Sequence, residues 1–202
     1  VPVSLDMALP DPDSPAGRAD WRAILDAVLP LVDIFTPSIE ELLFMLEPEH
    51  FAQLRREHEH DVVAAVPPDT FRRVAAEVLA RGVKVLLIKA GHRGAFLQAG
   101  DVSELTGTGS PLALTDGQGC PEGAFVPALS VDEEDTCNAS GAGDCAVAGF
   151  LAALLRGTSI RTAARYAMLA GRDNLYGPDA LSGLRTWDEM TSTIQESGDE
   201  TW

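Results

Sequence analysis

The sequence predicts an α/β protein built on an open, mostly parallel sheet with helices on both faces. Strand-like and helix-like segments alternate along the chain, the order typical of that architecture. The segment 83–91, VKVLLIKAG, is a continuous apolar run of the kind found in strands covered on both faces. With 202 residues, of which 46% are hydrophobic, we expect a single domain spanning 1–202. Helical spacing of apolar residues is clearest in the segment 18–32, at Trp21, Ile24, Leu25, Val28 and Leu29.

Each element of the first half is predicted from local signals. The segment 38–47 begins with Ser38, followed three residues later by Glu41, a capping-box pattern that starts helices. Gly82 is expected to end a helix over 69–82, because glycine tolerates the left-handed backbone that follows many helices. We also expect strands in 1–9, 33–37 and 83–91, a loop in 10–15, a helix in 18–32, an irregular or partly helical segment in 48–69, and a strand in 94–100 that forms a hairpin with 83–91.

The second half begins with a segment rich in Gly, Pro, Ser and Thr. Between residues 101 and 134 we expect at most short strands, such as one in 124–131. A helix is predicted from about Asp144 to Leu155, and Gly157 follows it. Further helices are expected in 159–175 and 186–195, and the tail 196–202 is expected to be frayed.

Charge and cysteine content restrict the partners. The net charge of −16 argues against nucleic acid or an anionic membrane, because both attract basic surfaces. A phosphorylated ligand would need local features such as helix N-termini, bare amides or a metal ion. Three cysteines without a CxxC pair, and an N-terminal segment without the pattern of a signal peptide, favour a reduced, cytoplasmic protein.

The segment Gly141–Ala142–Gly143–Asp144 is the clearest functional candidate. A helix that begins there leaves backbone N–H groups unpaired, and its dipole places partial positive charge at the same spot. The three small residues leave the amides open to an anion, such as a phosphoryl group in transfer. Asp144, in the first turn, would be held ionised and could accept a proton from an attacking hydroxyl. The alternative is a tight glycine turn with an ordinary first-turn acid, and four residues alone favour neither interpretation.

Two further elements are expected at the same sheet edge. KAGHRG, Lys89 to Gly94, follows a buried strand, and ligands of open α/β sheets collect where such strands end. Glu41 follows another short strand and could hold a metal ion through water. A hairpin turn and a capping glutamate are the respective alternatives. His58 and His60 suggest a metal site at first sight, but their spacing sends them to different faces of a strand or helix, which favours a solvated loop.

The order of these motifs resembles the PfkB (ribokinase-like) carbohydrate kinase family. The resemblance extends from VSLDMAL through TPSIEELLFML, VLLIKAGHRGAFL and NASGAGDCAVAGFLAALLRG to AARYAMLAG, and the Gly-Ala-Gly-Asp signature is its specific part. It implies a three-layer α/β/α fold. It also implies transfer of the γ-phosphoryl of ATP, with Mg²⁺, to a hydroxyl of a sugar or nucleoside. A monovalent cation such as K⁺ and a homodimer are further implications.

The resemblance also assigns roles to individual residues. Asp144 would be the catalytic base, and Gly141, Ala142 and Gly143 would form the anion hole. Glu41, with Ser38, would organise magnesium and phosphate, and Asn138 would lie at the cation site. The nucleotide would be lined by Lys89, Gly91, His92, Gly94 and Met168, of which Met168 has a core position and His92 an exposed one as alternatives.

The chain departs from the family pattern at four places. Ser38 stands where the family has asparagine, Asn138 replaces an aspartate, and Lys89 stands where a small hydroxyl residue is common. Lys89 could reach a phosphate or extend into solvent. The resemblance begins midway through the family fold, so we expect the part that carries most sugar contacts to be missing. These departures keep a second hypothesis open, a truncated, non-catalytic nucleotide-binding or interaction module.

Overall fold

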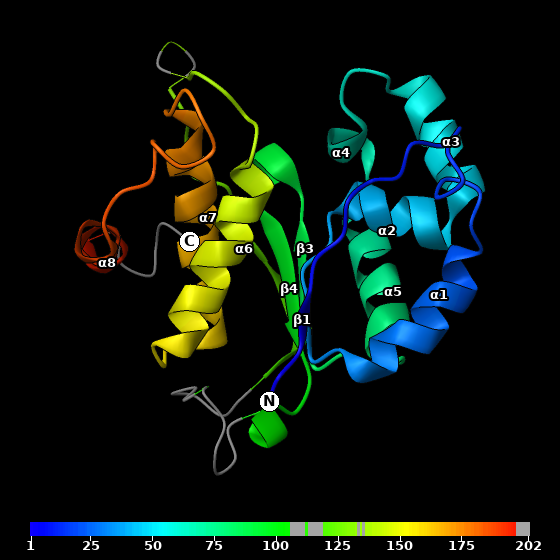
Figure 1. Ribbon diagram of the computed structural model, residues 1–202, viewed down its shortest axis with the longest axis horizontal. Helices are drawn as coiled ribbons and strands as arrows, with labels where there is room; N and C mark the ends of the chain where they lie inside the picture. The colour runs from blue at the N-terminus through cyan, green and yellow to red at the C-terminus, as the bar shows by residue number, and fades with distance from the viewer. Residues whose placement is uncertain (106–111, 113–118, 133, 135, 197–202) are drawn as a thin grey trace.

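The computed structural model describes residues 1–105, 112, 119–132, 134 and 136–196, and these contain a five-stranded sheet (Figure 1). The strands lie in the order of the chain. The first three are mutually parallel, the fourth is antiparallel to the third, and the fifth is antiparallel to the fourth, so four of the five share one direction. The predicted open, mostly parallel sheet is confirmed, as is the β3–β4 hairpin. The strands are β1 (Ser4–Leu5), β2 (Ile34–Phe35), β3 (Val85–Lys89), β4 (Ala95–Ala99) and β5 (Cys120–Val126).

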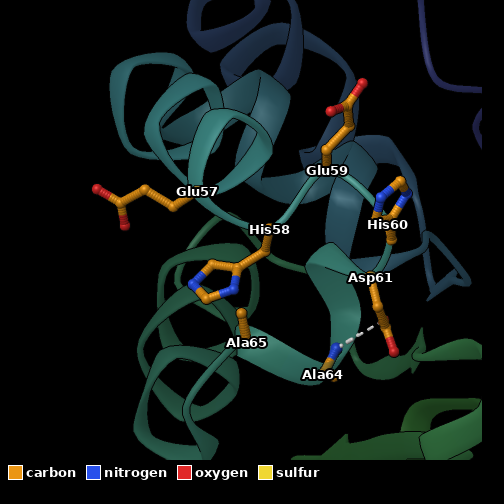
Figure 2. A pocket seen from close by; sticks show the side chains of 7 residues that line it. All are labelled: Glu57, His58, Glu59, His60, Asp61, Ala64 and Ala65. Atoms are coloured by element: carbon orange, nitrogen blue, oxygen red, sulfur yellow. Dashed lines mark hydrogen bonds between the residues drawn. The ribbon is translucent and has the colours of Figure 1, made fainter.

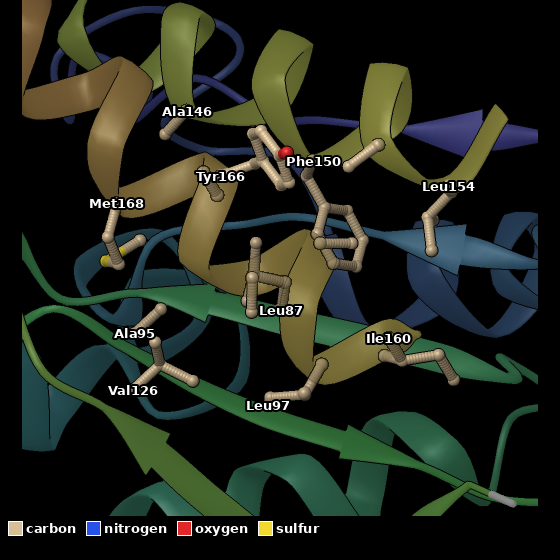
Figure 3. Close-up of a cluster of buried hydrophobic side chains, with 14 of the residues drawn as sticks. Leu87, Ala95, Leu97, Val126, Ala146, Phe150, Leu154, Ile160, Tyr166 and Met168 are labelled. Atoms are coloured by element: carbon tan, nitrogen blue, oxygen red, sulfur yellow. The ribbon is translucent and has the colours of Figure 1, made fainter. Parts of the chain in front are cut away.

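The sheet is covered on both faces because its central strands are apolar at nearly every position. Successive side chains of a strand point to opposite faces, so β3 feeds two cores. Val85 and Leu87 pack in one cluster, whereas Leu86 and Ile88 pack in the other. Figure 1 shows helices on both faces: α6 (Ala142–Leu155) and α7 (Ile160–Leu175) on one, and α1 (Trp21–Val28), α2 (Ile39–Leu46) and α5 (Pro68–Leu79) on the other. The α6–α7 side includes buried side chains from both helices and from β3, β4 and β5 (Figure 3).

The helices of the first half of the chain follow the predicted pattern, with one addition. Ser38 and Glu41 form the predicted capping box at the start of α2. The charged segment 48–69, expected to be irregular or partly helical, contains two short helices and the start of a third. Phe51 and Leu54, three residues apart, bury one face of the first of these. The elements are α1 (Trp21–Val28), η1 (Leu29–Leu31), α2 (Ile39–Leu46), α3 (Pro48–Glu57), α4 (Val62–Ala65) and α5 (Pro68–Leu79).

The second half differs from expectation mainly at element boundaries. The strand expected in 124–131 begins earlier, because β5 pairs with β4 up to Cys120 opposite Ala99. The helix expected from about Asp144 begins at Ala142, since left-handed Gly141 provides its N-cap. The remaining elements are η2 (Gly91–Arg93), η3 (Ser103–Leu105), α6 (Ala142–Leu155), α7 (Ile160–Leu175) and α8 (Trp187–Glu196).

The described residues test some of the remaining expectations only in part. No helix among them is long and apolar enough to cross a membrane. Cys120 and Cys145 are buried and Cys137 is exposed, and none of the three forms a disulfide with another described residue. Most of the expected frayed tail, residues 197–202, lies outside the described residues.

Candidate active site

The candidate site forms where the parallel strands end. Asp6 directly follows β1, Lys89 is the last residue of β3, and Glu41 lies in the first turn of α2, just after β2. Lys89 also forms a parallel bridge with Ser38, and its N–H donates to the Pro37 carbonyl over 2.8 Å. The carboxyl ends of three strands therefore bring one ammonium and two carboxylates to a single edge of the sheet.

The start of α6 supplies the fourth part of this edge. Gly141 has φ of +83°, a left-handed conformation that L side chains rarely adopt. A Cβ on Gly141 would also lie 2.8 Å from the Cβ of Ala180. Asp144 and Gly143 are exposed in the first turn, and the first amides of a helix have no acceptor within it. The geometry thus leaves open amides beside an accessible carboxylate.

Lys89 connects the strand ends to α6. A Cβ built on Gly143 would lie 4.0 Å from both Cε and Nζ of Lys89, so the ammonium faces the first turn of α6. The same ammonium contacts both carboxylate oxygens of Asp6, at 2.6 Å and 2.7 Å. Asp6 was not among the sequence candidates. The strand expected over 1–9 placed Asp6 inside a strand, whereas β1 ends at Leu5, so Asp6 lies at the edge where ligands of such sheets collect.

Glu41 is held by the capping box and is almost buried. The Ser38 N–H donates to Glu41 Oε2 over 2.6 Å, and the Glu41 N–H donates to Ser38 Oγ over 3.2 Å. Burial raises the pKa of the Glu41 carboxyl, and nearby Asp6 adds to this effect; the Ser38 N–H and the Lys89 charge oppose it without cancelling it. Burial therefore disfavours the ionised form of Glu41 in the free protein.

The turn after β3 divides into an open part and a packed part. At Gly91, with φ of +50°, an added Cβ would meet nothing within 4 Å, so the backbone there is accessible. Gly94 has a different reason to be glycine, because an added Cβ would lie 2.1 Å from the Val126 carbonyl oxygen. His92 is exposed, as its alternative interpretation had it, and its Nε2 lies 3.5 Å from Asp61 of α4.

Met168 and Asn138 have local partners. Met168 is buried in the cluster between α7 and the sheet, close to Ala95 and Val126 (Figure 3), which favours the core alternative for this residue. Asn138 Oδ1 accepts the Ser140 N–H over 2.8 Å, closing a turn ahead of α6. Both residues therefore contribute to the local structure, which the sequence pattern alone did not show.

The histidine segment between α3 and α4 lines a shallow hollow. Figure 2 shows the side chains of Glu57, His58, Glu59 and His60 pointing in different directions. Asp61 instead caps α4, accepting the Ala64 N–H over 2.9 Å. Within the part of the chain that the structure describes, no three His, Cys, Asp or Glu residues are grouped to hold a metal ion.

The chain is similar to a known family and to several solved structures. The sequence matches the family described as pfkB family carbohydrate kinase over residues 5–173. Similar solved structures include an Arabidopsis thaliana ribokinase complexed with ribose and ATP, at 19% identity and a TM-score of 0.65, covering 96% of this chain and 48% of that one. An E. coli putative ribokinase II in complex with ATP and Mg²⁺ matches at 23% identity and 0.58, covering 87% and 43%.

A third similar structure is the Salmonella enterica aminoimidazole riboside kinase complexed with aminoimidazole riboside and an ATP analogue. It matches at 18% identity and a TM-score of 0.60, covering 95% of this chain and 52% of that one. At these identities the likeness establishes the fold. The chain spans about half the length of the solved structures that it matches.

Proposed function

The chain belongs to the pfkB family of carbohydrate kinases, and from this membership we propose an ATP-dependent phosphotransferase. It moves the γ-phosphoryl group to a hydroxyl of a sugar or nucleoside. The observation that carries the proposal is the first turn of α6, which contains open amides and the exposed Asp144 carboxylate and which the Lys89 ammonium faces at Gly143. Solved structures of the same fold contain ATP with ribose, or an ATP analogue with a riboside, which supports the substrate class.

Asp144 is proposed to be the general base. It is exposed at the N-terminus of α6, so an acceptor hydroxyl can reach its carboxylate while the transferred phosphoryl group lies against the amides of the same turn. The amides of Gly143 and Asp144 would stabilise the charge on the phosphoryl oxygens, because helix N-termini favour anions; the Ala142 N–H already donates to the Ala139 carbonyl. Gly91 gives the nucleotide an open stretch of backbone.

Magnesium fits the donors present at the strand ends. Mg²⁺ usually keeps several waters and is held by one or two carboxylates together with substrate phosphates. Glu41, a buried carboxylate whose pKa is raised mainly by burial, offers one such ligand, with Asp6 close by. When bound, the ion would neutralise charge on the ATP phosphates. Ser38 Oγ already accepts the Glu41 N–H, so it supports the glutamate.

A monovalent cation is a further part of the proposal. Asn174 Oδ1 is buried without a hydrogen-bond partner among the described residues, and the same side chain lies near the position of a Gly141 Cβ. Together with the loop that contains Asn138, it offers neutral oxygen chemistry suited to K⁺. The ion would support the shape of the loop ahead of α6.

The decisive test is Asp144→Asn, assayed for phosphoryl transfer from ATP over a panel of sugars and nucleosides. We expect turnover to fall by at least about a thousand-fold while MgATP affinity changes little, because only the proton acceptor is lost. Asp188→Asn is the matched control, since Asp188 is also an exposed first-turn acid, on α8. Equal turnover in Asp144→Asn and the parent protein would refute the role of the base.

The truncated-module hypothesis is retained as the second candidate. β1 lies at the edge of the sheet, and Val1 and Val3 expose apolar side chains beside it. Such an edge can accept another strand, so a function in binding nucleotide or a partner is compatible with it. MgATP binding without turnover on any acceptor of the panel would favour this candidate over the kinase.

A further inference from the structure

An ion pair between Asp6 and Lys89 spans the strand edge of the site. The residues are 83 positions apart, on strands separated by β2, and both carboxylate oxygens contact the ammonium. The Lys89 side chain is only 14% exposed. The Lys89 side chain therefore does not extend into solvent but pairs with Asp6 at the strand edge.

The Lys89 ammonium can donate a further hydrogen bond. It carries three N–H donors, and Asp6 provides two acceptor oxygens, so one donor remains for a further oxygen. The place that this group faces is the first turn of α6, as the 4.0 Å separation from a Gly143 Cβ shows. A phosphate oxygen lying against the amides of that turn would come within reach of the same ammonium.

Charge balance gives Lys89 a specific importance. The chain contains two lysines, Lys84 and Lys89, and has a net charge of −16. Lys84 precedes β3 and pairs with Asp33 over 2.7 Å, at the opposite end of the strand. At the edge with Asp6 and Glu41, Lys89 therefore supplies a positive side chain that can offset the charge of an approaching polyphosphate.

We infer that Lys89 binds a phosphate group of ATP and that Asp6 is its positioning residue. This inference rests on the proposed kinase function and adds a role that Asp6 has through Lys89. In the free protein Asp6 holds the ammonium at the strand edge and keeps the long side chain extended toward α6. When ATP binds, its phosphate and Asp6 both contact the ammonium. Because the Lys89 side chain is already ordered, binding costs little further side-chain entropy.

The first test uses calorimetry with MgATP and with adenosine. In Lys89→Met we expect MgATP affinity to fall by at least about ten-fold and adenosine affinity to stay within about two-fold, because only the phosphate contact is lost. Lys89→Arg keeps the charge and should retain most of the MgATP affinity. Lys84→Met is the matched control and should bind both probes as the parent does. Equal MgATP affinity in Lys89→Met and Lys84→Met would overturn the inference.

The positioning role of Asp6 is tested by a double-mutant cycle. Asp6→Asn should change MgATP affinity by at least about three-fold when Lys89 is present and by less than about two-fold in the Lys89→Met background. The non-additivity follows because Asp6 acts through the ammonium. An Asp6 effect of the same size in both backgrounds would show that its own charge acts directly and would refute the positioning role.

A second measurement needs no substitution. With two lysines in the chain, acetylation of each can be followed by mass spectrometry in the parent protein. MgATP should slow the acetylation of Lys89 by several-fold and leave Lys84 unchanged, whereas adenosine should protect neither. Protection of neither lysine by bound MgATP would overturn the inference while leaving the kinase proposal standing. A parent protein that binds no MgATP would overturn both.

Discussion

Gly141→Ala is expected to destabilise the protein and to distort the turn ahead of α6. Gly141 has φ of +83°, and placing a non-glycine residue in the left-handed region costs about 1–2 kcal/mol. The new Cβ would also lie 2.8 Å from the Cβ of Ala180, which adds an overpacking cost of about 1–3 kcal/mol. Alanine also lowers the conformational entropy of the unfolded chain, which offsets this loss of stability by about 0.4–1 kcal/mol. The free energy of unfolding should therefore fall by about 2–3 kcal/mol.

The assay is thermal unfolding followed by circular dichroism, with Gly143→Ala as the control. For a chain of this size a loss of 2–3 kcal/mol corresponds to a decrease in Tm of about 5–10 °C. Gly143 lies inside α6, and the nearest atoms to an added Cβ are those of the Lys89 side chain at 4.0 Å, an ordinary contact distance, so alanine there should leave Tm unchanged or raise it. A Tm for Gly141→Ala equal to that of Gly143→Ala would refute the argument from backbone strain.

Three further predictions concern stability. Asp173→Ala should lower the free energy of unfolding by about 2–3 kcal/mol in urea titrations, because the buried carboxylate accepts two hydrogen bonds from the partly exposed Arg185; a loss below about 0.5 kcal/mol would contradict this. Phe150→Ala, in the core between α6 and the sheet, should cost about 3–5 kcal/mol by the same assay, and a smaller loss would show that the site collapses. Burial opposes ionisation of Asp33, but hydrogen bonds from Lys84 and the Val3 N–H outweigh it and lower its pKa. Its contribution is therefore present above the unfolded pKa of about 4 and lost as pH falls through the folded value, so Tm should fall less between pH 5 and pH 3 in Asp33→Asn than in the parent; equal slopes would refute it.

The sequence predicted the parts of the fold that depend on local periodicity. The β3–β4 hairpin and the α2 capping box are each encoded within a few residues, and both were found as expected. The start of β5 was not predictable in this way, because it depends on pairing with a strand 21 residues earlier, where Cys120 lies opposite Ala99. The short helices α3 and α4 are stabilised by burial of a few side chains against the rest of the protein.

Prediction of the site was limited in the same way, because contacts between residues far apart in the chain leave no local pattern. Gly91 and Gly94 look equivalent in the sequence, but the structure distinguishes them. The backbone at Gly91 is accessible, whereas residue 94 has to be glycine because the Val126 carbonyl lies close to it. Asp6 was missed because its partner, Lys89, is 83 residues away, and no local pattern marks a contact of that kind. Only the arrangement of three strand ends shows that these two residues meet.

The distribution of charge explains how an acidic protein could accept a polyphosphate. At physiological salt the Debye length is about 8 Å, so most of the 31 acidic residues of the chain have little effect on a ligand at the strand edge. The groups within a few ångströms determine the local potential: the amides of α6, the Lys89 ammonium and the carboxylates of Asp6 and Glu41. Asp6 is largely neutralised by Lys89, and burial disfavours the charge of Glu41. The pairing that hides Lys89 from solvent therefore also reduces the repulsion that the two carboxylates would otherwise exert on ATP.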